Sequence, residues 1–311
     1  MTGGYGSLSI SLLRLIQQIN CFFRILCLLD LIILFEIMNT NKFAVTFACY
    51  NALPYTKLCV ESMIKHGMPL DRLVVVDNGS QDGTREYLKT LPLGARIYNE
   101  ANLGCGVAWD QGALALQAEW TIIMNNDVLV SPSWIEKLIH SAESNGYKVV
   151  SPAMVEGDLD YDFDAFEATA SKEMVSVNRE GVIHGVCMVV HKSVWMDVGY
   201  FRASPKLLGY EDTLFFNELA NVGVPVATVG ACWLHHYGSI TQKEMAQERQ
   251  LNGKSGLGYR YNYKLLNKSW LERKLGKFKR RAQEKKWIKS ELQEHGMTIR
   301  GLRENGDFRW I

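Results

Sequence analysis

A polar triplet, Asn125-Asn126-Asp127, follows the apolar run Ile122–Met124. Such a run indicates a buried strand, and open α/β sheets bind their ligands at the carboxyl ends of strands. Cations such as Mg²⁺ and Mn²⁺ prefer oxygen ligands and bridge a carboxylate to phosphate oxygens. We therefore expect Asp127 to be a direct metal ligand, although an ordinary turn at a strand end has the same composition.

A second apolar run, Leu73–Val76, ends on Asp77 and Asn78 and continues into the loop Gly79–Thr84. The short polar side chains of this loop can hydrogen-bond a base or a ribose, and its glycines allow tight turns. The same residues also suit a loop that ends in a helix cap. Two strands of one sheet that both end on acids and amides predict one polar crevice for a charged ligand.

Two carboxylates, Glu211 and Asp212, begin an amphipathic stretch that continues through Leu214–Leu219. Acids at the start of a helix complement the helix dipole, and this is the plain explanation of the pair. The functional explanation is a general base held over the crevice, which takes the proton of an attacking hydroxyl group.

A pair of histidines, His235 and His236, ends another strand-like run. Neighbouring residues in a strand point to opposite faces, so at most one of the two can serve a given site. A single histidine at a strand end is usually structural, and only the company of Asp127 favours a role in metal binding.

Short β-rich runs alternate with amphipathic stretches between Phe43 and His236, which is typical of a mostly parallel sheet covered by helices. We predict an α/β fold on this basis. Ser133 and Glu136 have the spacing of a capping box and predict a helix start. The predicted strands are 43–48, 73–77, 95–98, 121–125, 148–151, 183–190 and 225–234, and the predicted helices are 55–66, 83–90, 106–118 and 133–144.

Several other classes of protein are excluded. The seven cysteines are scattered without a CxxC pair, which favours reduced, buried thiols over disulfides or a zinc site. Trp109 stands where a dinucleotide-binding motif that starts at Gly104 needs its third glycine, and the chain has no Walker loop. The acidic stretch Asp158–Asp164 lacks the glycine of an EF-hand loop, so we expect a solvated acidic loop.

Taken together and in this order, the motifs resemble those of the family-2 inverting glycosyltransferases over about Phe43 to Ser239. The resemblance implies a GT-A fold and the transfer of a sugar from a nucleotide-diphosphate sugar to a hydroxyl group of a glycan, lipid-linked or protein acceptor. The motifs are Cys49-Tyr50-Asn51, Val76–Ser80 with Asp82-Gly83-Thr84, Asn102-Leu103-Gly104, Asn125-Asn126-Asp127, Gly185–Met188 with Val198–Phe201, Gly209–Asp212 and the strand that ends on histidines.

The resemblance also implies roles for single residues. Asp127, with His235 or His236, would hold Mn²⁺ or Mg²⁺ on the diphosphate, where the metal offsets the charge of the leaving group. Asp212, with Glu211 beside it, would be the catalytic base. The implied donor-site residues are Tyr50, Asp77, Asn78, Asn102, Asn125 and Asn126.

Outside the motifs, we predict three parts: an apolar extension, 1–37, a catalytic domain, 38–240, and a basic helical region, 241–311. Charges interrupt the extension, which favours either a dispensable segment or a membrane-surface helix over a spanning one. Arg260–Lys289 holds twelve Lys or Arg residues against two Glu. This composition fits a helix packed on the catalytic domain or a peripheral contact with anionic lipid, and nucleic acid is the weakest of the alternatives. We expect a cytoplasmic protein, with any membrane contact on the inner face.

The sequence departs from the family pattern in two places: the first motivates a rival hypothesis, and the second concerns recognition of the acceptor. The usual DxD has become Asn125-Asn126-Asp127, which leaves one carboxylate for the metal, and Arg202 stands after Phe201 where an acid is common. The rival is a non-catalytic protein of the same fold that binds sugar nucleotides or glycans. A nucleotidyltransferase is disfavoured because Cys49–Pro54 contains no glycine.

Overall fold

The computed structural model describes residues 42–203, 211–238, 240, 265–266 and 268–311. The helices and strands of the described residues lie in the compact unit Phe43–Ile311. The N-terminal extension 1–37 and the stretch 241–264 lie outside the described residues. No helix within the described ranges is long and apolar enough to cross a bilayer.

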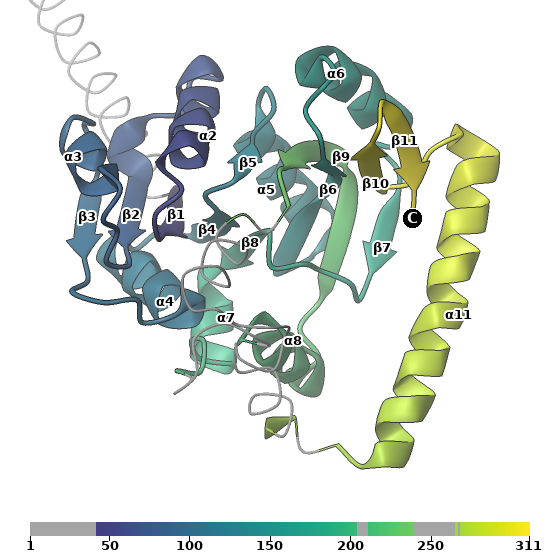
Figure 1. The fold of residues 1–311 in the computed structure, drawn as a ribbon. Coiled ribbons are helices and arrows are strands. Elements are labelled where there is room, and N and C mark those ends of the chain that lie inside the picture. Colours follow the sequence, from purple (N-terminus) through teal and green to yellow (C-terminus); the bar gives the residue numbers. More distant parts are fainter. Residues whose placement is uncertain (1–41, 204–210, 239, 241–264, 267) are drawn as a thin grey trace, which may run out of the picture. The chain divides into compact units, whose positions relative to one another are not determined.

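The first half of the sheet is parallel, in the spatial order β4-β1-β2-β3 (Figure 1). Its central strands are mostly apolar and buried, as in β2, where every residue is buried and only the last, Asp77, is charged. Strands covered on both faces need such continuous apolar runs. The strands are β1 (Phe43–Cys49), β2 (Leu73–Asp77), β3 (Ala95–Tyr98) and β4 (Trp120–Asn125), and the helices between them are α2 (Leu53–Lys65), α3 (Thr84–Lys89) and α4 (Cys105–Ala115).

The second half of the sheet is mixed. Strand β8 (Cys187–His191) lies between β4 and β6 (Val149–Gly157) and runs antiparallel to both. The long strand β9 (Val226–His236) is parallel to β6, with an irregularity between Pro152 and Ala153. Two short strands, β5 (Val128–Leu129) and β7 (Asn178–Glu180), pair with β9 in antiparallel register.

Helices cover both faces of this sheet. Helices α2 and α5 (Trp134–Asn145) pack on one face in the largest apolar core, which contains Val75 and Ile122. Helices α4, α7 (Lys192–Asp197) and α8 (Glu211–Val222) contribute to a second core on the other face. Helix α6 (Phe163–Glu173) packs against β9 in a third, aromatic core.

The C-terminal residues add a helix and two strands to the same unit. Helix α11 (Trp270–His295) begins with a capping box formed by Ser269 and Glu272. Strand β10 (Arg300–Glu304) then pairs in parallel with β6, and β11 (Asp307–Trp310) pairs with β10 (Figure 1). A buried bidentate ion pair between Arg179 of β7 and Glu291, with N–O distances of 2.7 and 2.8 Å, fastens α11 to the sheet.

The α/β class, the sheet and the helices that cover it are confirmed, with local differences. Strand β8 begins at Cys187 rather than residue 183, because residues 182–186 form an irregular segment. The capping box at Ser133 was a wrong prediction: Ser133 has a left-handed backbone (φ 54°) and makes no side-chain cap. The acidic loop is solvated as predicted, because Asp158, Asp160 and Asp162 are exposed; Asp162 also caps α6, and Asp160 pairs with Arg303.

Candidate active site

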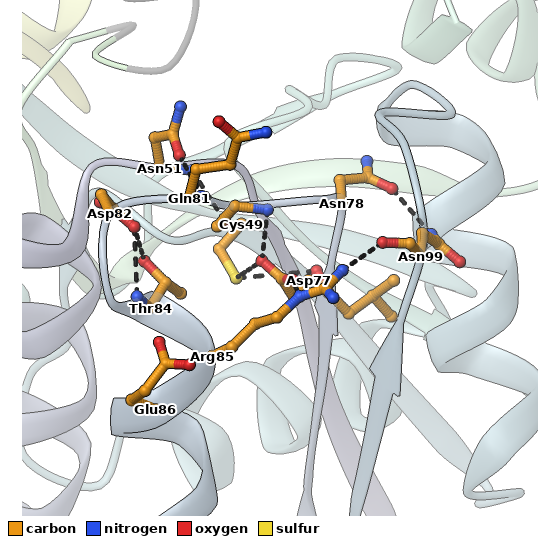
Figure 2. A network of polar contacts seen from close by, with 12 residues as sticks. Cys49, Asn51, Asp77, Asn78, Gln81, Asp82, Thr84, Arg85, Glu86 and Asn99 are labelled. Carbon is orange, nitrogen blue, oxygen red and sulfur yellow. Dashed lines mark hydrogen bonds and ion pairs between the residues drawn. The ribbon is translucent and has the colours of Figure 1, made fainter.

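The Asp77 carboxylate is fully buried at the end of β2 and both of its oxygens have protein partners (Figure 2). Oδ2 pairs with Nε of Arg85 in α3 at 2.5 Å, and Oδ1 accepts the N–H of Ser80 at 3.1 Å. Arg85 also donates to the backbone oxygen of Asn99. Asp77 therefore fixes the loop after β2 against α3, and thereby shapes the part of the crevice that the sequence assigns to the nucleotide.

Amides link this loop to the start of α4. The Asn99 amide donates to Oδ1 of Asn78 at 2.8 Å, and the Asn78 amide donates to the backbone oxygen of Gly104 at 3.2 Å. Asn99 and Gln111 exchange two further hydrogen bonds, at 2.9 and 3.0 Å. Asn78 is almost fully buried in this network, so its role is to hold two loops at the crevice together.

The loop after β1 carries two residues in the left-handed conformation, Asn51 (φ 53°) and Ala52 (φ 59°). The Asn51 side chain accepts the N–H of Gln81 at 2.9 Å, while its own N–H donates to Oγ of Ser80 at 2.8 Å (Figure 2). Because asparagine tolerates this backbone and can bond locally, the sequence suits the turn. The β1 and β2 loops are thus cross-linked at the carboxyl edge of the sheet.

Tyr50 and Asn102 flank these loops. Tyr50 is half-buried directly after β1. The Asn102 side chain accepts the N–H of Gly104 at 2.9 Å and so shapes the approach to α4. The structure brings Tyr50, Asp77, Asn78 and Asn102 to one edge of the parallel half-sheet.

The second cluster lies where β4 ends. Nε2 of His236 is 3.3 Å from Oδ1 of Asp127, and Nδ1 of the same ring is 3.3 Å from Oε2 of Glu156. The pairing of β5 with β9, in which Val128 lies opposite His236, brings the histidine to the triplet. The structure therefore joins one predicted histidine to the predicted metal ligand.

Electrostatics in this cluster are dominated by the His236 imidazole. Burial disfavours the charged ring, but hydrogen bonds and charges from Asp127 and Glu156 outweigh burial and raise the pKa of His236 to about 9. Burial likewise favours a protonated Asp127, yet His236 and the N–H of Ile240 outweigh it and lower the pKa of the carboxyl. The Asp127 carboxylate is thus ionised, as a metal ligand must be.

The two asparagines of the triplet have different surroundings. The Asn125 amide lies 3.5 Å from Nε2 of His236, at the same point as Asp127. The Asn126 amide donates to Oγ1 of Thr56 in α2 at 2.9 Å and is buried. Asn125 thus faces the cluster, and Asn126 fastens β4 to α2.

His235 faces the opposite side of β9. Its Nδ1 lies 3.0 Å from the hydroxyl of Tyr161, and its ring packs against the Tyr161 and Phe163 rings. Burial lowers its pKa to about 4, so the ring is neutral at physiological pH. His235 therefore belongs to the aromatic core, as the alternation along a strand requires for one member of the pair.

The predicted base lies at the start of α8, against a glycine. A Cβ on Gly185 would be 2.9 Å from Oδ2 of Asp212, so only a glycine admits the carboxylate there. Oδ1 of Asp212 accepts the backbone N–H of Thr213 at 2.7 Å. Burial outweighs this hydrogen bond and raises the pKa of Asp212, which makes the carboxylate a stronger base.

The thiol of Cys105 shows that the two carboxylate groups share one region. Cys105 is the first residue of α4. Burial raises its pKa, and Glu211, Asp212 and Asp127 each raise it further through their charges. The backbone links the same groups, because the N–H of Asn125 donates to the oxygen of Val186 at 2.9 Å, next to the glycine that contacts Asp212. The segment around Gly185 therefore connects Asp212, the predicted base, to the end of β4, which Asp127, the predicted metal ligand, follows.

The donor set of the cluster fits a divalent cation in part. Two adjacent ligands at about 2.1 Å from an octahedral metal lie about 3 Å apart. The separation of 3.3 Å between Asp127 Oδ1 and His236 Nε2 is close to this value, and the Asn125 amide faces the same point. Among the residues that the structure describes, no group of three or more His, Cys, Asp or Glu side chains is arranged to hold a metal ion.

Sequence reasoning missed three functional neighbours: Arg85, Gln111 and Glu156. Arg85 contacts Asp77 directly and Glu156 contacts His236, 80 residues away, while Gln111 reaches Asn78 only through Asn99. Glu156 stands at the end of an apolar strand, the signal that identified Asp77 and Asp127, and it could have been found in the same way.

Residues 45–198 match the family described as Glycosyl transferase family 2. These residues therefore form a family 2 glycosyltransferase domain. It is 25% identical over 109 residues to the putative glycosyltransferase EpsH of Bacillus subtilis (strain 168), a match that covers 34% of this chain and 31% of EpsH. It is 28% identical over 108 residues to the uncharacterized glycosyltransferase YibD of Escherichia coli (strain K12), covering 33% and 31%. The matches thus span about a third of these curated relatives.

Solved structures show the same fold. The structure of GalNAc-T7 with UDP, GalNAc and Mn²⁺ aligns with a TM-score of 0.50 at 14% identity, over 63% of this chain and 43% of that one. Staphylococcus aureus TarS also aligns with a TM-score of 0.50, at 17% identity, over 64% of this chain and 37% of that one. The family 2 domain of this chain therefore has the GT-A glycosyltransferase fold.

Proposed function

We propose that this protein transfers a sugar from a nucleotide-diphosphate sugar to an acceptor hydroxyl group, with inversion of the anomeric carbon. One observation carries the proposal: the N–H of Asn125 donates to the oxygen of Val186, next to Gly185, against which Asp212 packs, and this brings Asp212 towards Asp127 and its partner His236. A leaving-group site and a base on two sides of one crevice are what a single in-line displacement requires. Family membership and the fold support the same reaction.

The base in this proposal is Asp212. Its Oδ1 is engaged by Thr213, which leaves Oδ2, the atom that faces Gly185, to accept the proton of the acceptor hydroxyl. The new bond joins the acceptor oxygen to the anomeric carbon, and the bond from that carbon to the diphosphate breaks. The electron pair leaves with the diphosphate and the proton goes to Asp212. General bases of this kind contribute about 10² to 10⁴ in rate.

The metal in this proposal is Mn²⁺ or Mg²⁺, held by Asp127 and Asn125 and by His236, whose ring would release its Nε2 proton when the metal binds. When bound, such a cation offsets the negative charge that develops on the departing diphosphate. The chain's own contribution is orientation: Glu156 contacts Nδ1 of His236 and so directs Nε2 towards Asp127. Mn²⁺ in the GalNAc-T7 structure supports this choice of cation.

The donor's nucleoside would lie at the β1 and β2 loops. Tyr50, with its half-buried ring, and the cross-linked loop around Asn51 would form the sides of the nucleobase site. Asp77 and Asn78 would act through the loops that they hold, since their own side chains are buried and bonded within the protein. The UDP in the GalNAc-T7 structure supports a nucleotide in this crevice.

The proposal also includes a peripheral contact with an anionic membrane. Such a contact would suit an acceptor that is linked to a lipid. The N-terminal half of α11 exposes four large apolar side chains among many cations: Trp270, Leu271, Leu275 and Phe278, which are 52–73% exposed. Flotation with vesicles that contain an anionic lipid tests this part. Salt-sensitive binding that Phe278→Ser weakens would support it, and no binding at low salt would overturn it.

The direct test of the reaction is release of nucleoside diphosphate from UDP-, GDP- and dTDP-sugars in the presence of Mn²⁺. Mono- and disaccharide glycosides serve as acceptors, and NMR of the product reads the anomeric configuration. Release that depends on metal and acceptor, with inversion, is the expected result. Donor binding without turnover, unaffected by Asp212→Asn, would instead identify a non-catalytic binding protein.

A further inference from the structure

A cavity of about 280 Å³ lies between α11 and the sheet. Residues of α11, β6, β9 and β10 and of the irregular segment before β8 form its walls; they include Trp287, Ile288, Met154, Thr228, His184 and Arg300. None of these residues has a role in the proposed reaction. The volume is near the lower end of small-molecule sites, which begin at about 300 Å³, and suits one small ring.

The walls combine an aromatic face with a few polar groups. Trp287 is half-buried, and the Arg179 guanidinium lies 5.8 Å from its ring centroid. Because Arg179 is itself held by the buried ion pair with Glu291, the indole has a fixed support. A flat, supported aromatic face beside planar polar groups suits the apolar face of a sugar ring and its hydroxyl groups.

His184, which lines this cavity, has a ring nitrogen without a hydrogen-bond partner in the described part of the chain. Its Nε2 lies 2.7 Å from the backbone oxygen of Pro152, and a carbonyl can only accept, so the proton is on Nε2. Nδ1 is then an acceptor, and it is buried without a hydrogen-bond partner in the described part of the chain. Burial lowers the pKa of His184 to about 4, which keeps the ring neutral. Buried polar atoms without partners are uncommon, and a ligand hydroxyl group would satisfy this one.

The cavity adjoins the reaction site through two of its walls. His184 is followed by Gly185, against which the Asp212 carboxylate packs. Arg300, which also lines the cavity, has Nη2 3.9 Å from Oε2 of Glu156, the residue that contacts His236. Two wall residues of the cavity are therefore connected to the proposed reaction site, His184 along the chain to the glycine at Asp212 and Arg300 through Glu156 to His236.

We infer that the cavity between α11 and the sheet binds a saccharide unit of the acceptor, stacked on Trp287 and hydrogen-bonded to His184. This inference rests on the proposed transferase function. It assigns to the C-terminal helix, which lies outside the residues matched to the family, the selection of the acceptor.

The test measures binding of p-nitrophenyl glycosides of glucose, galactose, rhamnose and N-acetylglucosamine to the full-length protein by saturation-transfer NMR. Wild type should bind at least one of them, and Trp287→Ala should weaken that binding at least tenfold, while Trp287→Phe should retain most of it. Trp270→Ala is the matched control, because Trp270 lies on the same helix, is 65% exposed and is outside the cavity. Its binding should equal that of wild type.

Two results would overturn the inference: no glycoside binds to folded wild type, or Trp287→Ala binds as well as the control. A parallel thermal-shift measurement with sugar nucleotides and Mn²⁺ separates the two hypotheses. If the donor binds and no glycoside does, the inferred acceptor site is contradicted and the proposed function still stands. If neither donor nor glycoside binds, the acceptor site and the proposed function are both contradicted. If only a glycoside binds, the acceptor site is supported and the transferase function is contradicted.

Discussion

The carboxylates in the two halves of the site have different surroundings. At the β2 edge, Asp77 is fully buried and both of its oxygens are bonded to neighbouring protein groups. Across the crevice, Asp212 keeps one oxygen against a glycine, and Asp127 shares a histidine with Glu156. The first half is a closed scaffold, and in the proposed function the second holds its charges for a ligand. A carboxylate in the scaffold should therefore control stability, and one in the reactive half should control activity.

The largest effect should come from Asp212→Asn, which removes the proposed base and keeps the size of the side chain. We expect turnover to fall by about 10² to 10⁴ with no loss of donor binding. Steady-state release of nucleoside diphosphate measures it. Asp197→Asn, at an exposed acid of α7, is the control and should leave turnover unchanged. A loss of less than tenfold would place the base elsewhere.

Arg85→Ala tests the scaffold half. It leaves the buried Asp77 carboxylate without its ion pair, which should cost roughly 2–3 kcal/mol of unfolding free energy. Urea denaturation gives this value. Lys89→Ala on the same helix is the control, because its pair with Glu86 is exposed and 4.0 Å long, and it should change stability by less than about 0.5 kcal/mol. Equal effects of both substitutions would contradict the closed scaffold.

Glu156→Gln tests whether Glu156 orients His236 in the reactive half of the site. It weakens the acceptor that directs the His236 ring, and groups that orient metal ligands typically contribute about 10- to 100-fold in metal affinity. Mn²⁺ titration followed by electron paramagnetic resonance should show a loss in this range. Glu304→Gln, on an exposed strand, should bind Mn²⁺ as wild type does. Unchanged Mn²⁺ affinity in Glu156→Gln would contradict the orienting role.

The smallest effect concerns Asp110 in α4, whose carboxyl accepts the N–H of Phe201 at 3.0 Å. Burial outweighs that bond and raises its pKa from 3.8 to about 7. Because the folded-state pKa is raised, the unfolded carboxyl ionises first, and stability falls as pH rises from 3.8 towards 7. Asp110→Asn should therefore stabilise the protein at pH 8, by on the order of 1 kcal/mol after allowance for partial exposure, and not at pH 4. Thermal melts at both pH values test it, and an equal shift at both would contradict it.

Local sequence patterns predicted those features of the site that depend on one strand or one helix alone. The apolar runs before Asp77 and Asp127 placed both acids at strand ends, and the strand period separated His235 from His236. The helical spacing after Asp212 predicted α8.

What the sequence did not show depends on contacts between distant segments. The ion pair of Asp77 with Arg85 is set by the angle between β2 and α3, and the contact of Glu156 with His236 is set by the pairing of β6 with β9. Strands β10 and β11 were missed because Arg300–Glu304 is polar and short and gains its place only from the edge of β6. Ser133 has a left-handed backbone and its side chain makes no cap, although the local sequence fits a capping box.

The most direct test of the central claim is isothermal titration of wild type and Asp127→Ala with UDP- and GDP-sugars, in Mn²⁺ and in EDTA. The account predicts that wild type binds one donor class, that EDTA weakens this binding, and that Asp127→Ala binds the donor equally weakly with or without Mn²⁺. Binding that neither EDTA nor the substitution weakens, or no binding of any donor to folded wild type, would contradict a metal-assisted transferase site at Asp127.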